Sequence, residues 1–285
     1  MPALLRMDQL SPIGILGPGF LGRELARSRA WPVGSFSAGR RPVETPLTEI
    51  RFDWADESTW PALPEAPVAL VLSIPPVHRQ LEAETDRLRR WGTWMGAHRP
   101  QHRRLVYISS TGVYPDRPRN WSEDDTFEAD SDSGRLRLAT ERTLASFFDL
   151  RVVRPGGIYG PGRNLVTRIL EGKPLRPGSR PVHRIHVTDL AAVTARALED
   201  NAPTCLNAVD EQAETSAAVL AWVAEQDFYP EARRVRATAE QFISAAPARP
   251  RGRRQRRISN RRLLDDLGFQ FRYPTYRQGL AACFP

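Results

Sequence analysis

The sequence predicts an α/β protein with a doubly wound parallel sheet and a smaller C-terminal lobe interleaved with the end of that sheet. Short apolar runs bounded by glycine and proline alternate with longer segments of helical periodicity, a pattern typical of stacked strand-helix-strand units. After Gly156 this pattern loosens into loops rich in proline and glycine. We therefore expect residues 1–155 to form the core, and residues 156–285 to form mainly the smaller lobe, with some segments returning to the core.

Each expected element follows from a local pattern. The apolar runs predict strands at 13–16, 33–38, 68–74, 104–109 and 151–154. Helices are expected to begin near Phe20, His78, Gly134 and Thr188. The second of these helices is expected to cover one face of the sheet with a stripe formed by Leu81, Leu88, Trp91 and Met95. The C-terminal part predicts short elements near 182–187 and 204–209, and helices near 215–226 and 259–267.

The composition is that of an ordinary soluble protein. The chain has 285 residues, of which 41% are hydrophobic and 26% charged, and no apolar run approaches the roughly 20 residues that span a bilayer. No cleavage pattern follows the first residues, so a cytoplasmic protein is expected. Cys205 and Cys283 lie far apart without metal or redox spacing, and neither a disulfide framework nor a metal site is predicted.

A formal net charge of +8 raises the question of nucleic acid, and the run "RPRGRRQRRISNRR" (249–262) is the candidate arm. Of the 41 basic residues, all but Lys173 are arginines, and they are spread over the whole chain. No nucleic-acid-binding motif surrounds the run. Nucleic acid as a partner would rest on the charge alone, so we do not expect it.

The strongest motif is a glycine-rich turn between the first expected strand and the first expected helix. It reads G-x-G-x-x-G and consists of Gly17, Pro18, Gly19, Phe20, Leu21 and Gly22. Gly17 allows a tight turn, Gly19 lets the backbone approach a pyrophosphate, and Gly22 permits close packing of the helix. The helix N-terminus adds free N–H groups. The motif predicts a Rossmann-type dinucleotide-binding site, with an ordinary glycine turn as the alternative.

Cofactor selectivity depends on the residues about 20 positions further along. An acidic side chain there would hold the ribose 2′-hydroxyl of NAD, but the stretch "SFSAGRRP" offers Arg40 and Arg41 instead. Guanidinium groups pair with a 2′-phosphate, so NADP is favoured, with NAD as the alternative. Asp53 follows the third strand, where it is expected either to accept a hydrogen bond from the adenine amine or to cap the next helix.

Three longer stretches carry a family resemblance. They are "RRLVYISSTGVYPD" (103–116), "RVVRPGGIYGPGRN" (151–164) and "RIHVTDLAAV" (184–193). Together they resemble the extended short-chain dehydrogenase/reductase superfamily, in its NAD(P)-dependent epimerase/dehydratase group, over essentially the whole chain. The stretch "LSIPP" (72–76) looks like that of an atypical bacterial branch of this superfamily. The resemblance implies that Ser73, Ile74 and Pro75 also contact the cofactor.

The same resemblance implies a catalytic set that this chain alters. It places Ser110, with Ser109 beside it, where the superfamily has the residue that hydrogen-bonds the reacting oxygen. The acid/base pair Tyr-x-x-x-Lys is matched by Ser133 and Arg137, and no Tyr-x-x-x-Lys occurs anywhere in the sequence. Arg137 keeps a positive charge, but a serine hydroxyl is a much poorer proton donor and acceptor near neutral pH than an activated tyrosine.

Other residues compete for the role of proton carrier. Tyr114 is the best substitute, although the tyrosine at this position of the superfamily is more often a packing residue. His186 with Asp189 suggests a dyad or a metal site, whereas the family interpretation makes these residues and His183 structural.

Two classes of function remain open. One is an NADP-dependent oxidoreductase or epimerase-like enzyme acting on a hydroxyl or carbonyl compound, with a nucleotide-linked sugar among the candidates. The other is a catalytically silent NAD(P)-binding sensor. The resemblance also raises a homodimer through the helices after His78 and Gly134.

Overall fold

The computed structural model describes residues 12–66, 68–77, 79–175, 180–245 and 256–284. The chain divides into two compact units. The first unit contains residues 1–113, 128–154 and 191–205, and the second contains residues 114–127, 155–190 and 206–285. Each unit is therefore assembled from three separate stretches of the chain.

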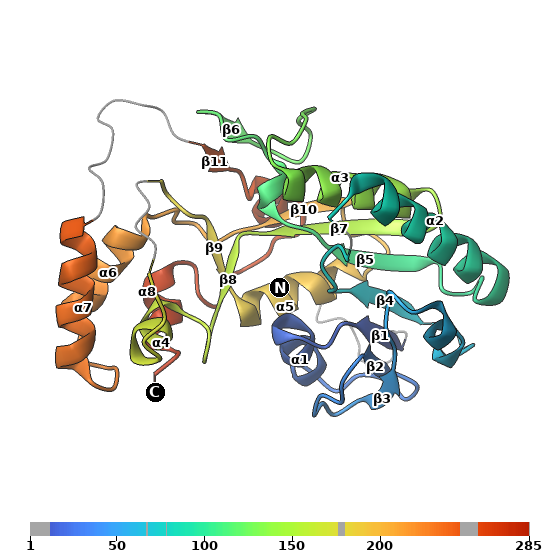
Figure 1. Ribbon diagram of the computed structural model, residues 1–285, viewed down its shortest axis with the longest axis horizontal. Coiled ribbons are helices and arrows are strands. Elements are labelled where there is room, and N and C mark those ends of the chain that lie inside the picture. The colour runs from blue at the N-terminus through green and yellow to red at the C-terminus, as the bar shows by residue number, and fades with distance from the viewer. Residues whose placement is uncertain (1–11, 67, 78, 176–179, 246–255, 285) are drawn as a thin grey trace. The chain divides into compact units, whose positions relative to one another are not determined.

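Eleven strands are present among the described residues. They are β1 (Ile13–Leu16), β2 (Phe36–Gly39), β3 (Thr48–Arg51), β4 (Ala69–Leu72), β5 (Arg104–Ile108), β6 (Asn120–Trp121), β7 (Asp149–Pro155), β8 (Gly157–Tyr159), β9 (Arg184–His186), β10 (Cys205–Ala208) and β11 (Arg257–Ile258). Seven of these strands form one sheet in the order β10-β7-β5-β4-β1-β2-β3, and the pairs from β7 to β3 are parallel (Figure 1). The predicted doubly wound parallel sheet is confirmed.

The helices of the described residues connect these strands. They are α1 (Phe20–Arg27), α2 (Leu81–His98), α3 (Asp132–Ala145), α4 (Leu165–Leu170), α5 (Val187–Ala197), α6 (Ser216–Ala224), α7 (Ala232–Ala245) and α8 (Tyr276–Ala281). Shorter turns are the 3₁₀ segments η2 (Glu57–Ala62) and η3 (Thr111–Val113) and the π-helical segment η4 (Arg262–Asp266). No helix in this part of the chain is long and apolar enough to cross a membrane.

The strand order reverses between β1 and β4. On one side of β1 lie β2 and β3, and on its other side lie β4 and β5. In an open α/β sheet, ligands bind outside the carboxyl ends of the strands at such a switch point. The glycine-rich turn follows β1, and Ser73 follows β4. Ser73 donates its backbone N–H to the carbonyl of Leu16 at 2.8 Å, which fixes the two strand ends against each other.

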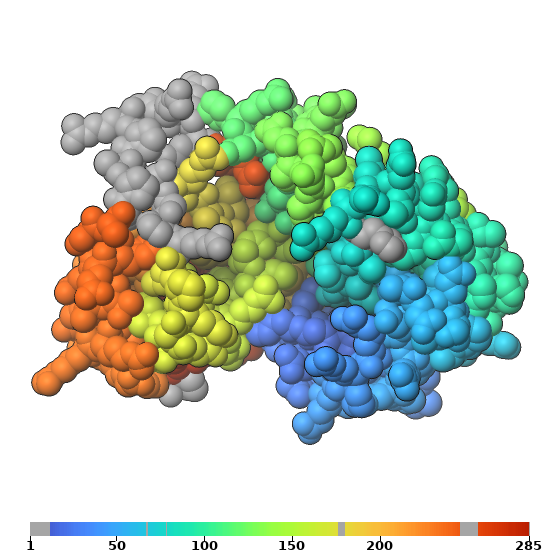
Figure 2. Space-filling model, viewed as in Figure 1, coloured from blue at the N-terminus to red at the C-terminus, as the bar shows by residue number. Residues whose placement is uncertain are grey.

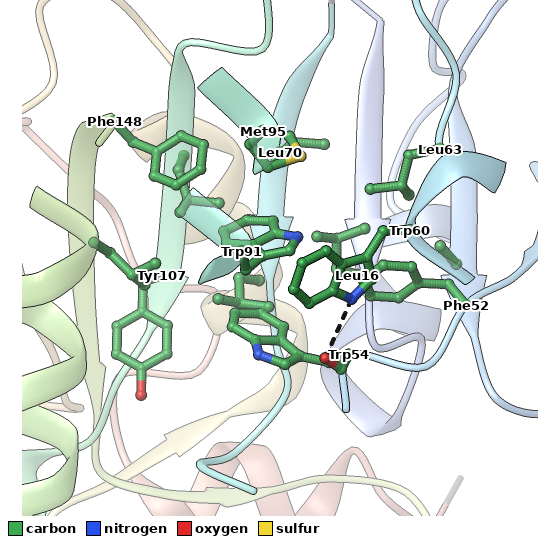
Figure 3. Packing of buried hydrophobic residues seen from close by; sticks show 14 of the residues in the cluster. Leu16, Phe52, Trp54, Trp60, Leu63, Leu70, Trp91, Met95, Tyr107 and Phe148 are labelled. Carbon is green, nitrogen blue, oxygen red and sulfur yellow. Dashed lines mark hydrogen bonds between the residues drawn. The ribbon is translucent and has the colours of Figure 1, made fainter. Parts of the chain in front are cut away.

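The helices α2 and α3 cover one face of the sheet in the first unit. Strand residues at alternate positions, such as Leu70 and Leu72, point toward Leu88 and Trp91 of α2, and all four are fully buried. Figure 3 shows the aromatic part of this core, in which the Trp60 indole N–H donates to the carbonyl of Trp54. The rings of Trp54 and Trp91 stack with centroids 4.9 Å apart.

The second unit has a core of its own, built from helices. α6, α7, α4 and α8 contribute the buried side chains of Val219, Val235, Val166 and Leu280 to one cluster. In Figure 2, the orange surface of α7 adjoins the yellow-green surface of α4. The Asn164 side chain caps α4 by accepting a hydrogen bond from the backbone N–H of Thr167.

Several expected elements differ from the structure. The second strand begins at Phe36 rather than at position 33, because Gly34 has a φ of +93° and Val33 is fully exposed in a turn. The second helix begins at Leu81, which is 45% exposed and does not join the buried stripe. His78, where this helix was expected to begin, lies outside the described residues. The predicted helix near 259–267 is present as the short π-helical segment η4.

Candidate cofactor and catalytic site

The glycine-rich turn joins β1 to α1 at the switch point. Gly17 has a φ of +89°, which a residue with a side chain rarely adopts, and its N–H donates to the carbonyl of Ala38 at 2.9 Å. A Cβ at this position would lie 2.6 Å from Cγ1 of Ile74. Gly17 is therefore required both for the turn and for the approach of the segment 73–75.

The other two glycines of the motif differ in their surroundings. A Cβ at Gly22 would lie 2.9 Å from the carbonyl oxygen of Gly17, so Gly22 serves the close packing of α1. A Cβ at Gly19 would meet no heavy atom within 4 Å, and Gly19 is exposed. No side chain caps the N-terminus of α1, and no acidic residue stands in its first turn. This open, uncapped helix end is suited to an anionic group.

Within the motif, Pro18 and Leu21 are buried and Phe20 is half-buried. Leu21 is 4% exposed, so only its backbone can face a ligand. Ser73 and Ile74 are half-buried beside the turn, and Pro75 is exposed. The structure thus brings together the segments 17–22 and 73–75 that were predicted to bind a cofactor.

A cavity of about 310 Å³ lies beside this turn. Its lining includes Pro18, Gly39 and both predicted arginines, Arg40 and Arg41, whose side chains are exposed. Within the described ranges, neither guanidinium forms an ion pair. The cavity therefore offers two cationic groups at the end of β2.

Two residues of β3 that the sequence did not indicate also line this cavity, namely Glu49 and Arg51. The stretch "SFSAGRRP" contains no carboxylate, and Glu49 supplies one from the neighbouring strand. β3 pairs with β2 so that Arg51 lies opposite Gly39. This pairing joins residues 12 positions apart, which spacing along the chain does not show.

Asp53 follows β3 and is half-buried. Its carboxylate accepts the backbone N–H of Ala55 at 3.0 Å, whereas the cap of η2 is Asp56, which accepts from Ser58. The alternative that Asp53 caps the next helix is therefore wrong. A contact between Asp53 and an adenine amine stays a prediction.

Helix α3 packs against the 3₁₀ segment η3, which follows Ser110. A Cβ at Gly134 would lie 2.7 Å from the carbonyl oxygen of Gly112, so only glycine permits this approach. The Ser110 hydroxyl accepts the N–H of Gly112 at 3.0 Å. Ser133 is exposed in the first turn of α3, and Arg137 donates to the carbonyl of Ser109 at 3.0 Å.

A buried ionic network that sequence reasoning missed lies one turn further along α3. Glu141 accepts the hydroxyl of Ser109 and pairs with Arg154 of β7 at 2.6 Å. All three side chains are less than a tenth exposed. The signal available in the sequence was the spacing of four between Arg137 and Glu141, which places both on one side of the helix.

Tyr114 belongs to the second unit and is 2% exposed. Its hydroxyl donates to Oδ1 of Asn207 at 2.8 Å, and its ring lies 4.7 Å from that of Phe127. These contacts favour the packing role that the sequence left as the alternative to proton transfer.

The histidines near the last landmark accept backbone hydrogen bonds. Nε2 of His183 accepts from Ile258 at 3.0 Å, and Nδ1 of His186 accepts from Thr188 at 3.2 Å. Burial lowers the pKa of each imidazole to about 4. The Asp189 carboxylate accepts the backbone N–H groups of Arg272 and Tyr273. These contacts support structural roles rather than a catalytic dyad.

No group of three or more His, Cys, Asp or Glu side chains in the described part of the chain could hold a metal ion. Of the arginine-rich run 249–262, residues 249–255 lie outside the described residues. The remainder contains β11, which pairs with β6. Arg256 donates to the carbonyl of Tyr114, and Arg262 pairs with Asp124.

An open parallel sheet with a glycine-rich turn at its switch point is the fold of dinucleotide-binding α/β proteins. No family model matches this sequence, and no curated protein matches it. Among solved structures, a conserved protein of unknown function from Silicibacter pomeroyi is 24% identical with a TM-score of 0.71, covering 96% of this chain and 98% of its own.

Two further structures have the same fold. A short-chain dehydrogenase/reductase superfamily protein from Agrobacterium tumefaciens with bound NAD is 17% identical with a TM-score of 0.65, covering 95% of this chain and 96% of its own. UDP-N-acetylglucosamine 4-epimerase from Methanobrevibacter ruminantium, in complex with UDP-N-acetylmuramic acid, is 14% identical with a TM-score of 0.70, covering 96% and 97%. This chain thus has the fold of short-chain dehydrogenase/reductase and epimerase proteins.

Proposed function

We propose that this protein is an NADP-dependent oxidoreductase or epimerase-like enzyme that acts on a hydroxyl or carbonyl compound. The observation that carries the proposal is the open position at Gly19, next to the uncapped N-terminus of α1 and the cavity lined by Arg40 and Arg41. A pyrophosphate fits the first feature, and a 2′-phosphate fits the second. The NAD bound to one similar structure supports a nicotinamide dinucleotide as cofactor, and the UDP-sugar bound to the other supports a nucleotide-linked substrate.

In this proposal the residues of the first unit hold NADP. The segments 17–22 and 73–75 surround its pyrophosphate, Arg40 and Arg41 pair with its 2′-phosphate, and Asp53 accepts from the adenine amine. Bound NADP supplies a nicotinamide that accepts or donates hydride. NAD remains the alternative cofactor, and Glu49 in the cavity lining is the feature that favours it.

The proposed chemistry uses the hydroxyls at the end of β5 and the start of α3. Ser110 donates a hydrogen bond to the reacting oxygen of the substrate and polarises it. Ser133, exposed on α3, passes the proton between that oxygen and water. Arg137 keeps a positive charge next to the end of β5 through its bond to the carbonyl of Ser109. A nucleotide-linked sugar is the substrate class suggested by the resemblance.

The second candidate is a catalytically silent NADP-binding sensor. It is favoured by Ser133, because a serine hydroxyl is a much poorer proton donor and acceptor than an activated tyrosine. The sensor would keep the cofactor residues and lose turnover.

Titration with NADPH and NADH, followed by turnover assays with a panel of carbonyl compounds, separates the two candidates. We expect NADPH to bind more tightly than NADH. We also expect wild type to oxidise NADPH slowly, and the rate of this oxidation to fall at least tenfold in Ser110→Ala. Tight binding with no turnover above that of Ser110→Ala would favour the sensor. If neither nucleotide binds, both candidates are wrong.

A further inference from the structure

The end of β3 supplies a third arginine to the cavity beside the glycine-rich turn. Arg51 lies opposite Gly39 in the parallel pairing of β2 and β3, and the next residue, Phe52, donates its N–H to the carbonyl of Gly39 at 3.0 Å. Arg51 lines the same cavity as Arg40 and Arg41. The backbone of Arg51 is therefore fixed by the sheet, whereas Arg40 and Arg41 stand in the loop after β2.

The absence of a side chain at Gly39 lets the glycine-rich turn lie close to the end of β2. A Cβ at Gly39 would lie 3.0 Å from Cδ of Pro18, which belongs to the glycine-rich turn. Pro18, Gly39 and Arg51 thus form a continuous row from the expected pyrophosphate position to the last strand of the sheet. A nucleotide whose pyrophosphate rests at Gly19 would extend its adenosine along this row.

The charges of the cavity explain why a third arginine matters. Glu49 stands two residues before Arg51, so both lie on the same side of β3, and both line the cavity. A carboxylate at this place repels a phosphate dianion. Arg51 is exposed, and in the part of the chain that the structure describes it forms no ion pair with Glu49. The hydrogen bonds from Ser58 lower the pKa of the exposed Asp56, and the positive charge of Arg51 lowers it further.

We propose that Arg51 is a specificity-determining residue that binds the 2′-phosphate of NADP and outweighs the repulsion from Glu49. This inference rests on the proposed function, because it assumes that the cavity receives the adenosine end of a dinucleotide. A guanidinium on a strand is held more precisely than one on a loop, and its forked donors match a phosphate. Arg51 discriminates NADP from NAD, and Arg40 and Arg41 add to the attraction.

The test uses fragments that contain only the adenosine end, 2′,5′-ADP and 5′-AMP, with binding measured by calorimetry. Replacing Arg51 with leucine is expected to weaken the binding of 2′,5′-ADP about tenfold and to change the affinity for 5′-AMP less than about twofold. Arg51→Lys keeps the charge without the fork and is expected to fall between wild type and Arg51→Leu. Glu49→Gln is expected to strengthen the binding of 2′,5′-ADP about twofold to threefold, because it removes a charge that repels the phosphate.

The matched control is Arg89→Leu, which removes an exposed arginine paired with Asp86 on α2 and is expected to change neither affinity. Thermal unfolding of each variant checks that it is folded. If wild type prefers 2′,5′-ADP and Arg51→Leu retains that preference in full, the role of Arg51 is refuted while the proposed function stands. If wild type binds neither fragment nor NADPH, the proposed function fails and the role of Arg51 fails with it.

Discussion

Glu141 links three parts of the first unit through one carboxylate. It lies on α3, accepts the hydroxyl of Ser109 at the end of β5, and pairs with Arg154 of β7. Because both charged groups are buried, removing one leaves the other without compensation in a region of low dielectric constant. The pair is therefore a positioning element for the end of β5, where Ser110 and the carbonyl bound by Arg137 are found.

Glu141→Ala is expected to lower the free energy of unfolding by about 3–5 kcal/mol, since it strands the buried guanidinium of Arg154. Urea denaturation measures this loss. The matched control is Asp132→Ala on the same helix. It removes an ion pair with Arg135, and the side chain of Asp132 is 89% exposed. Exposed pairs contribute at most about 1 kcal/mol, so equal losses in the two variants would contradict the prediction.

His183 makes the stability depend on pH. Its folded-state pKa is lowered to about 4 from the ordinary 6.5, first by desolvation and then by nearby arginines. The folded state then binds fewer protons than the unfolded state between about pH 4 and 6.5, so stability rises with pH across this window and is lost on acidification. Protonation of Nε2 would also turn the acceptor of the Ile258 N–H into a donor.

Between pH 7 and pH 4.5, we expect the unfolding free energy of wild type to fall by about 2 kcal/mol more than that of His183→Gln. The reason is that glutamine keeps a hydrogen-bond acceptor that does not titrate. Asp210, whose pKa burial raises to about 7, acts in the opposite direction in both proteins and cancels in the comparison. Urea titrations at the two pH values give the difference. Identical losses in the two proteins would exclude this role of His183.

At the scale of the element, the glycines of the β1–α1 turn separate folding from binding. Gly19→Ala is expected to leave the thermal midpoint within about 2 °C of wild type, because its methyl group meets no atom. It is expected to weaken NADPH binding at least about tenfold, because the methyl group occupies the phosphate position. Gly17→Ala is the contrasting variant, since it forces a side chain into a φ of +89° against Ile74 and is expected to destabilise the fold. Calorimetry and thermal unfolding read both effects. Full NADPH affinity in a folded Gly19→Ala variant would rule out this phosphate site.

The sequence predicted those elements whose signals are local. β1 and the start of α1 at Phe20 were predicted correctly, because an apolar run, three glycines and an amphipathic helix follow one another directly. Helix α7 was missed, because three arginines flank Val235, the first of its buried residues, and look like a solvated surface. Contacts between distant residues left no pattern either. Glu49 enters the cavity through strand pairing, and Arg154 meets Glu141 through packing of α3 on the sheet.

At the scale of the whole molecule, the candidate cofactor residues are concentrated in one unit. The segments 17–22 and 73–75, together with Arg40, Arg41 and Asp53, all belong to the first unit. The second unit has a separate hydrophobic cluster formed by α4, α6, α7 and α8. A ligand stabilises the structure to which it binds, by about 2.7 kcal/mol at 100 times its dissociation constant. The division of the chain therefore predicts where a bound nucleotide slows the opening of the structure.

Hydrogen exchange followed by mass spectrometry of peptides tests this division. With saturating NADPH, we expect amides of β1, α1 and β2 to exchange at least about tenfold more slowly, because their opening must now release the nucleotide. Peptides from α6 and α7 are expected to change less than about twofold. The Gly19→Ala variant is the control, and under the same conditions the slowing should be smaller in it by about the factor by which its NADPH affinity falls. Equal slowing in α6 and α7 would mean that the two units open together, because protection would then follow the stability of the whole chain rather than that of the unit that binds the nucleotide.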